Sequence, residues 1–161
     1  MDHIYWVLDN LLAGRPGPTR EPWDARLLYR GGIRVVVSLA QEVAVEDLSR
    51  YGITHFKAEF PPTTLFSEGM RKAFIYMALP VWRFMDAQIL EGKPTLVHCF
   101  KGEDRTGTVL SGYLVVYRGI EPEDAIAQVR AANPLVMRED GYEEAVRLLK
   151  PHQQPDPRTL L

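Results

Sequence analysis

The sequence predicts an α/β protein with a central, mostly parallel sheet of four to five strands flanked by helices. Two short runs, residues 33–39 and 94–98, have the apolar or β-branched content of strands that are covered on both faces. Longer segments of helical composition separate such runs, and glycines or prolines stand between the segments. Strands that alternate with helices along a chain are typical of a parallel sheet between helical layers.

The composition indicates one soluble globular domain, which we assign to residues 1–150, followed by a weakly structured tail over 151–161. A single cysteine excludes a disulfide scaffold and a zinc ribbon and indicates a reducing, cytoplasmic location. We find no export signal and no apolar stretch long enough to span a membrane. A net charge of −2 gives no general attraction for nucleic acid. We expect a monomer that uses no metal and no cofactor.

The first half of the chain contains short predicted elements. Residues 4–8, 11–13, 33–39 and 53–60 are predicted strands, and residues 22–30 and 46–51 are predicted helices. Gly31-Gly32 and Gly52 end the two helices, because glycine readily takes up the backbone conformation found at helix ends. Residues 53–60 alternate in polarity, as a strand with two different faces does, and Pro61-Pro62 end that strand.

The second half is mostly helical. Residues 68–90 favour a helix, but Pro80 lacks a backbone N–H, so we expect a kink there or a split into two helices. Residues 94–98 form the predicted central strand. Residues 106–117 are apolar almost all round, which predicts a buried helix. Two further helices are predicted over 122–132, where Pro122 suits the first turn, and over 141–150.

The segment from His98 to Gly107, HCFKGEDRTG, joins the predicted central strand to the buried helix. A loop in this position can turn successive backbone N–H groups inward, and the N-terminus of the following helix adds a partial positive charge. Arg105 can offer a planar fork to two oxygens of a bound anion. The same positive surroundings favour the thiolate form of Cys99. The segment is therefore a candidate phosphate site that contains a nucleophile.

Cys99, five intervening residues, Arg105 and Thr106 resemble the signature loop of the cysteine-based protein tyrosine phosphatases. The rest of the chain, over about residues 4–148, resembles the compact dual-specificity type of that superfamily. The matching segments outside the loop are Trp6-Val7-Leu8, Leu12-Ala13-Gly14, the strand Val35-Val36-Val37-Ser38-Leu39, and Gly119-Ile120 ahead of Pro122.

The resemblance implies a role for each residue of the loop. Cys99 would form a phosphocysteine, and Arg105 would bind the phosphate and stabilise its equatorial oxygens in the transition state. Thr106 would donate a hydrogen bond to the leaving thiolate, and His98 would help to hold the thiolate geometry from behind the loop. The substrate would be bound by the loop residues Phe100, Lys101, Gly102, Glu103, Asp104 and Arg105.

The general acid has two candidates. Most members of the superfamily use an aspartate on a separate loop, and this sequence offers Glu59 at the matching strand end. Asp104 is the other candidate, because the ending Asp-Arg-Thr resembles phosphatases in which the acid comes from the loop itself. We place Asp104 ahead of Glu59, although Asp104 could instead cap the following helix. Asp140 is a weak candidate for positioning the hydrolytic water; the alternative is an acidic first turn of the last helix.

We therefore expect a metal-independent phosphomonoesterase that acts on phosphotyrosine, and on phosphoserine or phosphothreonine, in proteins or peptides. The alternatives are a phosphoinositide or inositol phosphate phosphatase, a non-catalytic phosphate-binding module and a sulfur-transfer enzyme. An intact Cys99 argues against a binding module, because binding alone does not require a thiol. Glu103 argues against the lipid alternative, because it puts negative charge where lipid phosphatases usually carry lysine.

Overall fold

The computed structural model describes residues 2–160 and confirms the α/β fold with a five-stranded, mostly parallel sheet. The strands lie in the order β1-β2-β5-β3-β4. They are β1 (Tyr5–Leu8), β2 (Leu12–Arg15), β3 (Val35–Ala40), β4 (Thr54–Phe60) and β5 (Thr95–His98). Only the pair β1 and β2 is antiparallel, which follows from the tight connection between them.

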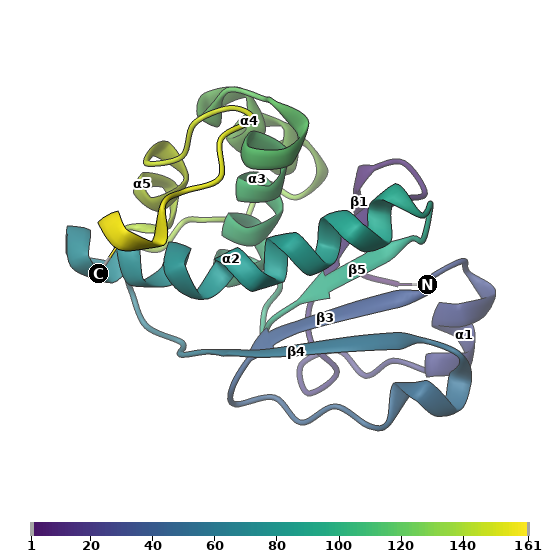
Figure 1. Cartoon of the computed structure of the whole chain (residues 1–161). Coiled ribbons are helices and arrows are strands. Elements are labelled where there is room, and N and C mark those ends of the chain that lie inside the picture. The colour runs from purple at the N-terminus through teal and green to yellow at the C-terminus, as the bar shows by residue number, and fades with distance from the viewer. Residues whose placement is uncertain (1, 161) are drawn as a thin grey trace.

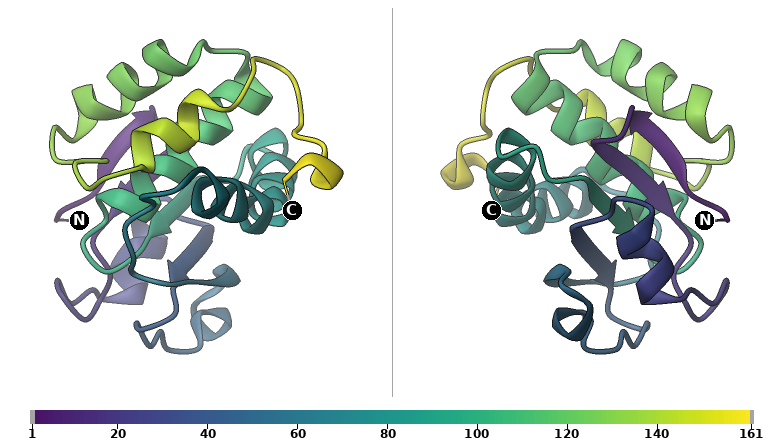
Figure 2. Two further views of the ribbon diagram at one scale, coloured as in Figure 1. Left: turned by 90° about the vertical axis from the view of Figure 1, so that its left-hand side faces the viewer. Right: turned by 90° about the vertical axis from the view of Figure 1, so that its right-hand side faces the viewer.

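Helices cover both faces of the sheet (Figure 1). They are α1 (Ala25–Arg30), η1 (Leu48–Tyr51), α2 (Glu68–Leu90), α3 (Asp104–Arg118), α4 (Pro122–Ala132), α5 (Tyr142–Arg147) and η2 (Pro157–Thr159). Residues of α2 to α5 share a large apolar core with one face, while α1 and η1 cover a smaller core on the other. Accordingly, α1 lies apart from the cluster of α3 to α5 in both turned views (Figure 2).

The central strands bring their carboxyl ends to one edge of the sheet. In the parallel registers, His98 of β5 is paired with Ser38 of β3 on one side and with Arg15 of β2 on the other. All residues of β2, β3 and β5 are buried, in agreement with the apolar content of residues 33–39 and 94–98. The segments that leave these three strands therefore start at the same level, and one of them begins with Cys99.

Of the kink or split expected at Pro80, the split does not occur, because α2 is one continuous helix of 23 residues. Pro80 lies on the exposed face of α2, where water can bond the carbonyl group that a proline leaves without a partner. Its neighbours Ala78, Val81 and Trp82 are buried in the large core. Packing on the buried face therefore maintains the helix across the proline.

The ends of several helices differ from the prediction by one to three residues, including the starts of α1 and η1. The buried helix starts at Asp104, two residues before the predicted start at Thr106, so Asp104 and Arg105 belong to its first turn. The last helix runs only from Tyr142 to Arg147, within the predicted range 141–150. All of these differences are at helix ends, where hydrogen bonds to side chains and neighbouring loops outweigh helix propensity.

The segment after α5 is in contact with the helical layer. The N–H of His152 donates to the carbonyl of Val115 in α3, and Leu160 packs against the large core. In Figure 1 this segment, drawn in yellow, lies beside the start of α2. Within residues 2–160, none of the helices has the length and hydropathy needed to cross a bilayer.

Candidate active site

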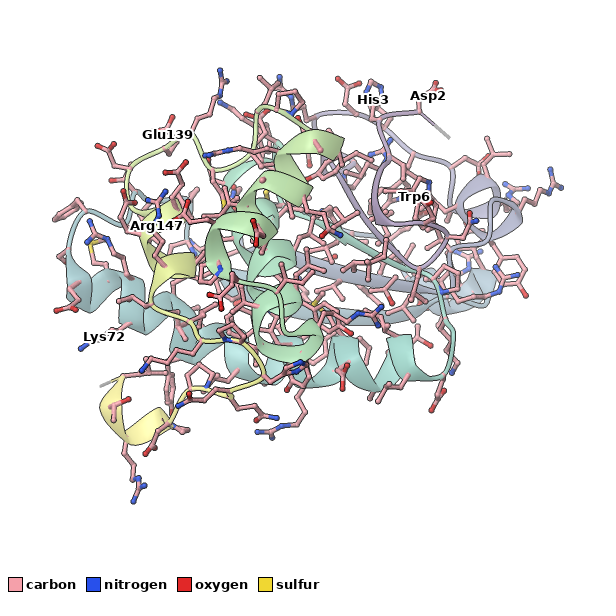
Figure 3. The ribbon with its side chains drawn as sticks, turned by 90° about the horizontal axis from the view of Figure 1, so that it is seen from above. Asp2, His3, Trp6, Lys72, Glu139 and Arg147 are labelled. Atoms are coloured by element: carbon pink, nitrogen blue, oxygen red, sulfur yellow. The ribbon has the colours of Figure 1, made fainter. Side chains whose placement is uncertain are left out.

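A pocket of about 250 Å³ lies at the carboxyl edge of the sheet. The loop after β5 and the first turn of α3 form its floor, and the segments after β3, after β4 and before α5 form its walls. Its floor residues are Cys99, Phe100, Lys101, Asp104 and Arg105. Its walls include Glu42, Pro62, Thr63, Thr64, Glu139 and Tyr142. Glu139 is on the loop ahead of α5, on the side of the molecule opposite α1 (Figure 3).

The loop 99–103 packs against β1 and the segment that follows β2. The N–H of Gly17 donates to the carbonyl of Phe100 over 3.0 Å, and the hydroxyl of Tyr5 donates to the carbonyl of Gly102. Gly102 has a φ of +72°, and a Cβ there would lie 2.4 Å from the carbonyl oxygen of Arg15. A side chain at this position would be both strained and blocked. The tight loop therefore depends on Gly102.

Arg105 is buried at the floor of the pocket and is held by two residues outside the loop. Its Nη1 and Nη2 donate to Oε1 and Oε2 of Glu42 over 2.7 and 2.6 Å, and Nη1 also donates to the carbonyl of Phe60 over 3.0 Å. A guanidinium has five N–H bonds, and these contacts use three of them. Among the described residues, none accepts from Nε or from the second hydrogen of Nη2. These two donors lie side by side and form a fork that can bind two oxygens of one phosphate group.

Glu42 is the main residue of this site that sequence reasoning missed. It stands two residues after β3 ends, on the edge of the sheet where Cys99 also lies. That position was a usable signal, because the carboxyl ends of parallel strands meet at the same edge. Its hydrogen bonds from Arg105 lower the pKa of the Glu42 carboxyl, so it stays charged and fixes the orientation of the guanidinium.

Asp104 lines the pocket and is half-buried. It does not cap α3, since the N-cap residue is Glu103 and has no side-chain capping bond. Instead its Oδ1 accepts from the N–H of Glu139 over 3.3 Å. Burial raises the pKa of Asp104, and the charge of Glu139 adds to this, against the opposing effect of the backbone hydrogen bonds. A carboxyl group in this setting can hold a proton at a higher pH than an exposed aspartate.

Glu59 is in a different place. It lies on β4 with its side chain exposed, and it is not among the residues that line the pocket. The segment after β4 instead contributes Pro62, Thr63 and Thr64, which carry no carboxyl group. The structure therefore brings Asp104 and Cys99 together in one pocket and leaves Glu59 outside it.

Of the remaining predicted site residues, some line the pocket and others lie beside or behind it. Phe100 and Lys101 line the pocket, whereas Glu103 is turned toward Arg138, with 3.9 Å between their charged groups. Thr106 follows Arg105 in α3 and is buried, and its hydroxyl oxygen has no partner among the described residues. His98 is fully buried behind the loop, and its Nδ1 lies 3.0 Å from the carbonyl oxygen of Cys99.

Two residues near the start of the last helix, one ahead of it and one in its first turn, also line the pocket. Glu139 and Tyr142 line it, but Asp140, the predicted water-positioning candidate, does not. The hydroxyl of Tyr142 donates to the carbonyl of Thr63 over 2.5 Å, which ties α5 to the segment after β4. Burial raises the pKa of Tyr142 to about 12, so the phenol stays neutral and donates.

The pocket thus combines a thiol, a cationic fork with two donors that no described residue uses, and a half-buried carboxyl group. A family model described as "Polymorphic toxin system, DSP-PTPase phosphatase" matches residues 13–119, about two thirds of the chain. The matched range includes most of β2, the whole of β3, β4 and β5, the loop 99–103 and the whole of α3.

Solved structures of phosphatases share the fold. Tk-PTP in its active form is 22% identical, with a TM-score of 0.76 over 92% of this chain and 97% of that one. Human DUSP28 is 17% identical, with a TM-score of 0.74 over 92% and 93% of the two chains. PTPMT1 in complex with PI(5)P is 16% identical, with a TM-score of 0.71 over 91% and 94%. Together with the family match, the loop and the fold establish that this chain belongs to the DSP-PTPase family, a compact type of cysteine-based phosphatase.

Proposed function

We propose that this protein hydrolyses phosphate monoesters in proteins or peptides through a phosphocysteine on Cys99. The observation that carries the proposal is the free Nε and Nη2 edge of Arg105, in a pocket that Cys99 also lines. A phosphate group on this fork fits a site that holds the thiol as nucleophile. Cys99 then attacks the phosphorus, and Arg105 stabilises the charge on the phosphate oxygens.

The proposed reaction has two steps. In the first, the Cys99 thiolate attacks phosphorus, the ester P–O bond breaks, and the leaving oxygen takes a proton from Asp104. In the second, water attacks the phosphocysteine, Asp104 takes a proton from that water, and the S–P bond breaks to release phosphate and the thiolate. Thr106, whose hydroxyl has no partner within residues 2–160, is the proposed donor to the sulfur in this second step. Asp104 can serve both steps because its raised pKa lets it exchange a proton nearer to neutral pH.

We propose phosphotyrosine as the main substrate, with phosphoserine and phosphothreonine as further ones. Besides Arg105, the pocket lining carries one cation, Lys101, and three carboxyl groups, those of Glu42, Asp104 and Glu139. This balance disfavours a ligand with several phosphates. PTPMT1, which shares the fold, has been crystallised with PI(5)P, so a phosphoinositide substrate is the alternative. A nucleophilic thiol requires a reducing compartment, in keeping with a cytoplasmic protein.

The first test is hydrolysis of p-nitrophenyl phosphate with a metal chelator present. We expect activity in the wild type, none in Cys99→Ser, and a loss of at least about a hundredfold in Arg105→Lys, which keeps the charge but loses the fork. Arg83→Lys, an exposed arginine on α2, is the matched control and should keep full activity. Activity that survives Cys99→Ser would overturn the mechanism.

The substrate class is tested by comparing kcat/KM for phosphotyrosine, phosphoserine and phosphothreonine peptides with kcat/KM for PI(5)P in micelles. A higher value for a peptide supports the proposal, and a higher value for PI(5)P supports the alternative. If wild type and Cys99→Ser bind a phosphopeptide equally well without turnover, the protein is a binding module. Thiocyanate release from thiosulfate and cyanide without phosphatase activity would identify a sulfur-transfer enzyme.

A further inference from the structure

Three side chains on neighbouring strands form a chain of hydrogen bonds behind the loop that carries Cys99. The Nε2 of His55 on β4 lies 2.7 Å from the hydroxyl oxygen of Ser38 on β3. The same oxygen lies 2.6 Å from Nε2 of His98 on β5. On the far side of its ring, Nδ1 of His98 lies 3.0 Å from the carbonyl oxygen of Cys99. The chain therefore crosses three strands and ends on the backbone of the proposed nucleophile.

The direction of every hydrogen bond from His55 through Ser38 to His98 follows from the contact between Nδ1 of His98 and the carbonyl oxygen of Cys99. A carbonyl oxygen only accepts, so Nδ1 of His98 carries the hydrogen. Burial lowers the pKa of His98 to about 4, so the ring is neutral at pH 7 and its Nε2 has a free lone pair. Ser38 must then donate its only hydrogen to His98. His55 in turn must donate from Nε2 to the oxygen of Ser38.

The surroundings of the chain keep these roles fixed. His98 is fully buried and Ser38 is 2% exposed, so water does not compete for their hydrogen bonds. The ring of Trp23 meets His98 edge-on at 5.1 Å and restrains its rotation. His55 is the half-buried outer end of the chain.

The charged groups near His55 have opposing effects. Burial is the main cause that lowers the pKa of His55. The charge of Lys57 on the same strand lowers this pKa further, and the charge of Asp47 ahead of η1 raises it. His98 is the titratable group that faces His55 across β3. A neutral His55 that carries its hydrogen on Nε2 and a protonated His55 both donate to Ser38, so the direction of the chain is the same in both states.

We infer that His55 is a positioning residue for the Cys99 loop, which acts through Ser38 by fixing the tautomer of His98. If residue 55 accepted a hydrogen bond instead, it would compete for the hydrogen of Ser38. His98 would then gain by moving its own hydrogen to Nε2, and a lone pair on Nδ1 would face the carbonyl oxygen of Cys99. The loop would lose its anchor at the residue that carries the thiol. This inference gives a role to a residue outside the pocket, and its importance for turnover rests on the proposed function.

The test compares two nearly isosteric substitutions. His55→Gln can donate from its side-chain amide to Ser38, whereas His55→Glu offers only acceptor oxygens when ionised. Lys57→Gln is the control for charge, because it also makes the net charge of the protein one unit more negative and lies on the same strand as His55. The readouts are the ¹⁵N chemical shifts of the His98 ring and the rate at which iodoacetamide alkylates Cys99, the only cysteine in the sequence, at pH 7.

We expect His98 to carry its hydrogen on Nδ1 in the wild type, in His55→Gln and in Lys57→Gln, with alkylation rates within about twofold of one another. In His55→Glu we expect the hydrogen to move to Nε2 and alkylation to slow by roughly three- to tenfold, the effect of one lost hydrogen bond. If His55→Glu does not fold, the smaller His55→Asp takes its place, because its ionised carboxyl group also offers only acceptor oxygens, and the same movement of the hydrogen and the same slowing are expected.

The inference is wrong if His98 keeps its hydrogen on Nδ1 and Cys99 reacts at the same rate in His55→Glu, or in His55→Asp where that variant replaces it. It is also wrong if Lys57→Gln or His55→Gln reproduces the effect, since charge or packing would then be the cause. Neither readout needs turnover. A protein without phosphatase activity that still gives the expected ¹⁵N shifts and alkylation rates would overturn the proposed function and leave the inference about His55 intact.

Discussion

At the scale of single residues, Arg105 has to satisfy two partners at once. Glu42 and the carbonyl of Phe60 take three of its donors on one side and leave a fork on the other. The residue pattern of the loop predicts that fork, because Cys99 and Arg105 stand at a fixed spacing between a strand and a helix. It does not predict Glu42, which is 63 residues away in sequence and becomes a neighbour only through strand order.

The first prediction concerns Glu42→Gln. The amide keeps the shape of the side chain but can accept from Arg105 with only one oxygen, so the guanidinium should be less well oriented. We expect kcat/KM for p-nitrophenyl phosphate to fall roughly ten- to hundredfold, the usual effect of a lost charge-assisted bond. Glu59→Gln, on the exposed face of β4, is the matched control and should stay within twofold. Equal losses in both variants would show that Glu42 has no special role.

The second prediction concerns Asp104→Asn. A general acid must be protonated, so activity that depends on Asp104 should fall as the pH rises through its raised pKa. The variant should lose activity and should lose this alkaline limb of the pH–rate profile. The loss should be larger for an alkyl phosphate than for p-nitrophenyl phosphate, whose leaving group needs less help from an acid. If the alkaline limb survives in Asp104→Asn and disappears in Glu59→Gln, then Glu59 is the acid.

At the scale of elements, composition predicts the central strands and the buried helix well, because their residues are covered on all sides. It predicts helix ends and Pro80 less well. A proline on an exposed helix face is tolerated when residues on the other face are packed, and the sequence alone does not say which face is exposed. Likewise, Asp104 and Arg105 join α3 because the loop before them is held by contacts from β1 and β2, which are distant in sequence.

The third prediction tests how closely α2 and α3 pack. A Cβ at Gly112 of α3 would lie 2.2 Å from the buried ring of Trp82, whose indole nitrogen donates to the carbonyl of Val109 over 2.9 Å. We expect Gly112→Ala to lower the free energy of unfolding by about 1–3 kcal/mol, as overpacking of a core does. Gly69→Ala in α2 is the matched control, because its Cβ would meet nothing closer than 3.9 Å. That variant should be unchanged or up to about 1 kcal/mol more stable in urea unfolding. Equal effects in the two variants would contradict the packing.

At the scale of the whole molecule, one sheet edge collects residues from the ends of several segments. The order β1-β2-β5-β3-β4 puts β5 in the middle, so the loop after it is supported by the segments that leave β2 and β3. Sequence patterns indicate which runs are strands, but strand order depends on long-range packing that no local pattern encodes. This is why the loop with Cys99 is predictable and its support by Tyr5 and Gly17 is not.

The same central position makes the stability of the whole fold depend on pH through His98. Burial lowers the pKa of His98 from 6.5 to about 4 in the folded protein. Between these two values the unfolded chain binds a proton on this ring and the folded protein does not, so folding loses stability as the pH falls from 6.5 toward 4. This contribution to the free energy of unfolding is fully present above pH 6.5. The shift of the His98 pKa corresponds to a loss of about 3 kcal/mol in that free energy once the pH has fallen below 4.

His98→Asn should remove this dependence, since its amide can still donate to the carbonyl of Cys99 but does not titrate. In urea unfolding at pH 7 and pH 4.5, the wild type should lose about 2–3 kcal/mol more than His98→Asn between the two conditions. The carboxyl groups and His55 titrate in both proteins, so the difference between the two slopes isolates residue 98. Equal slopes would mean that His98 is protonated as easily in the folded protein as in the unfolded chain. Burial would then not be what keeps His98 neutral behind the loop.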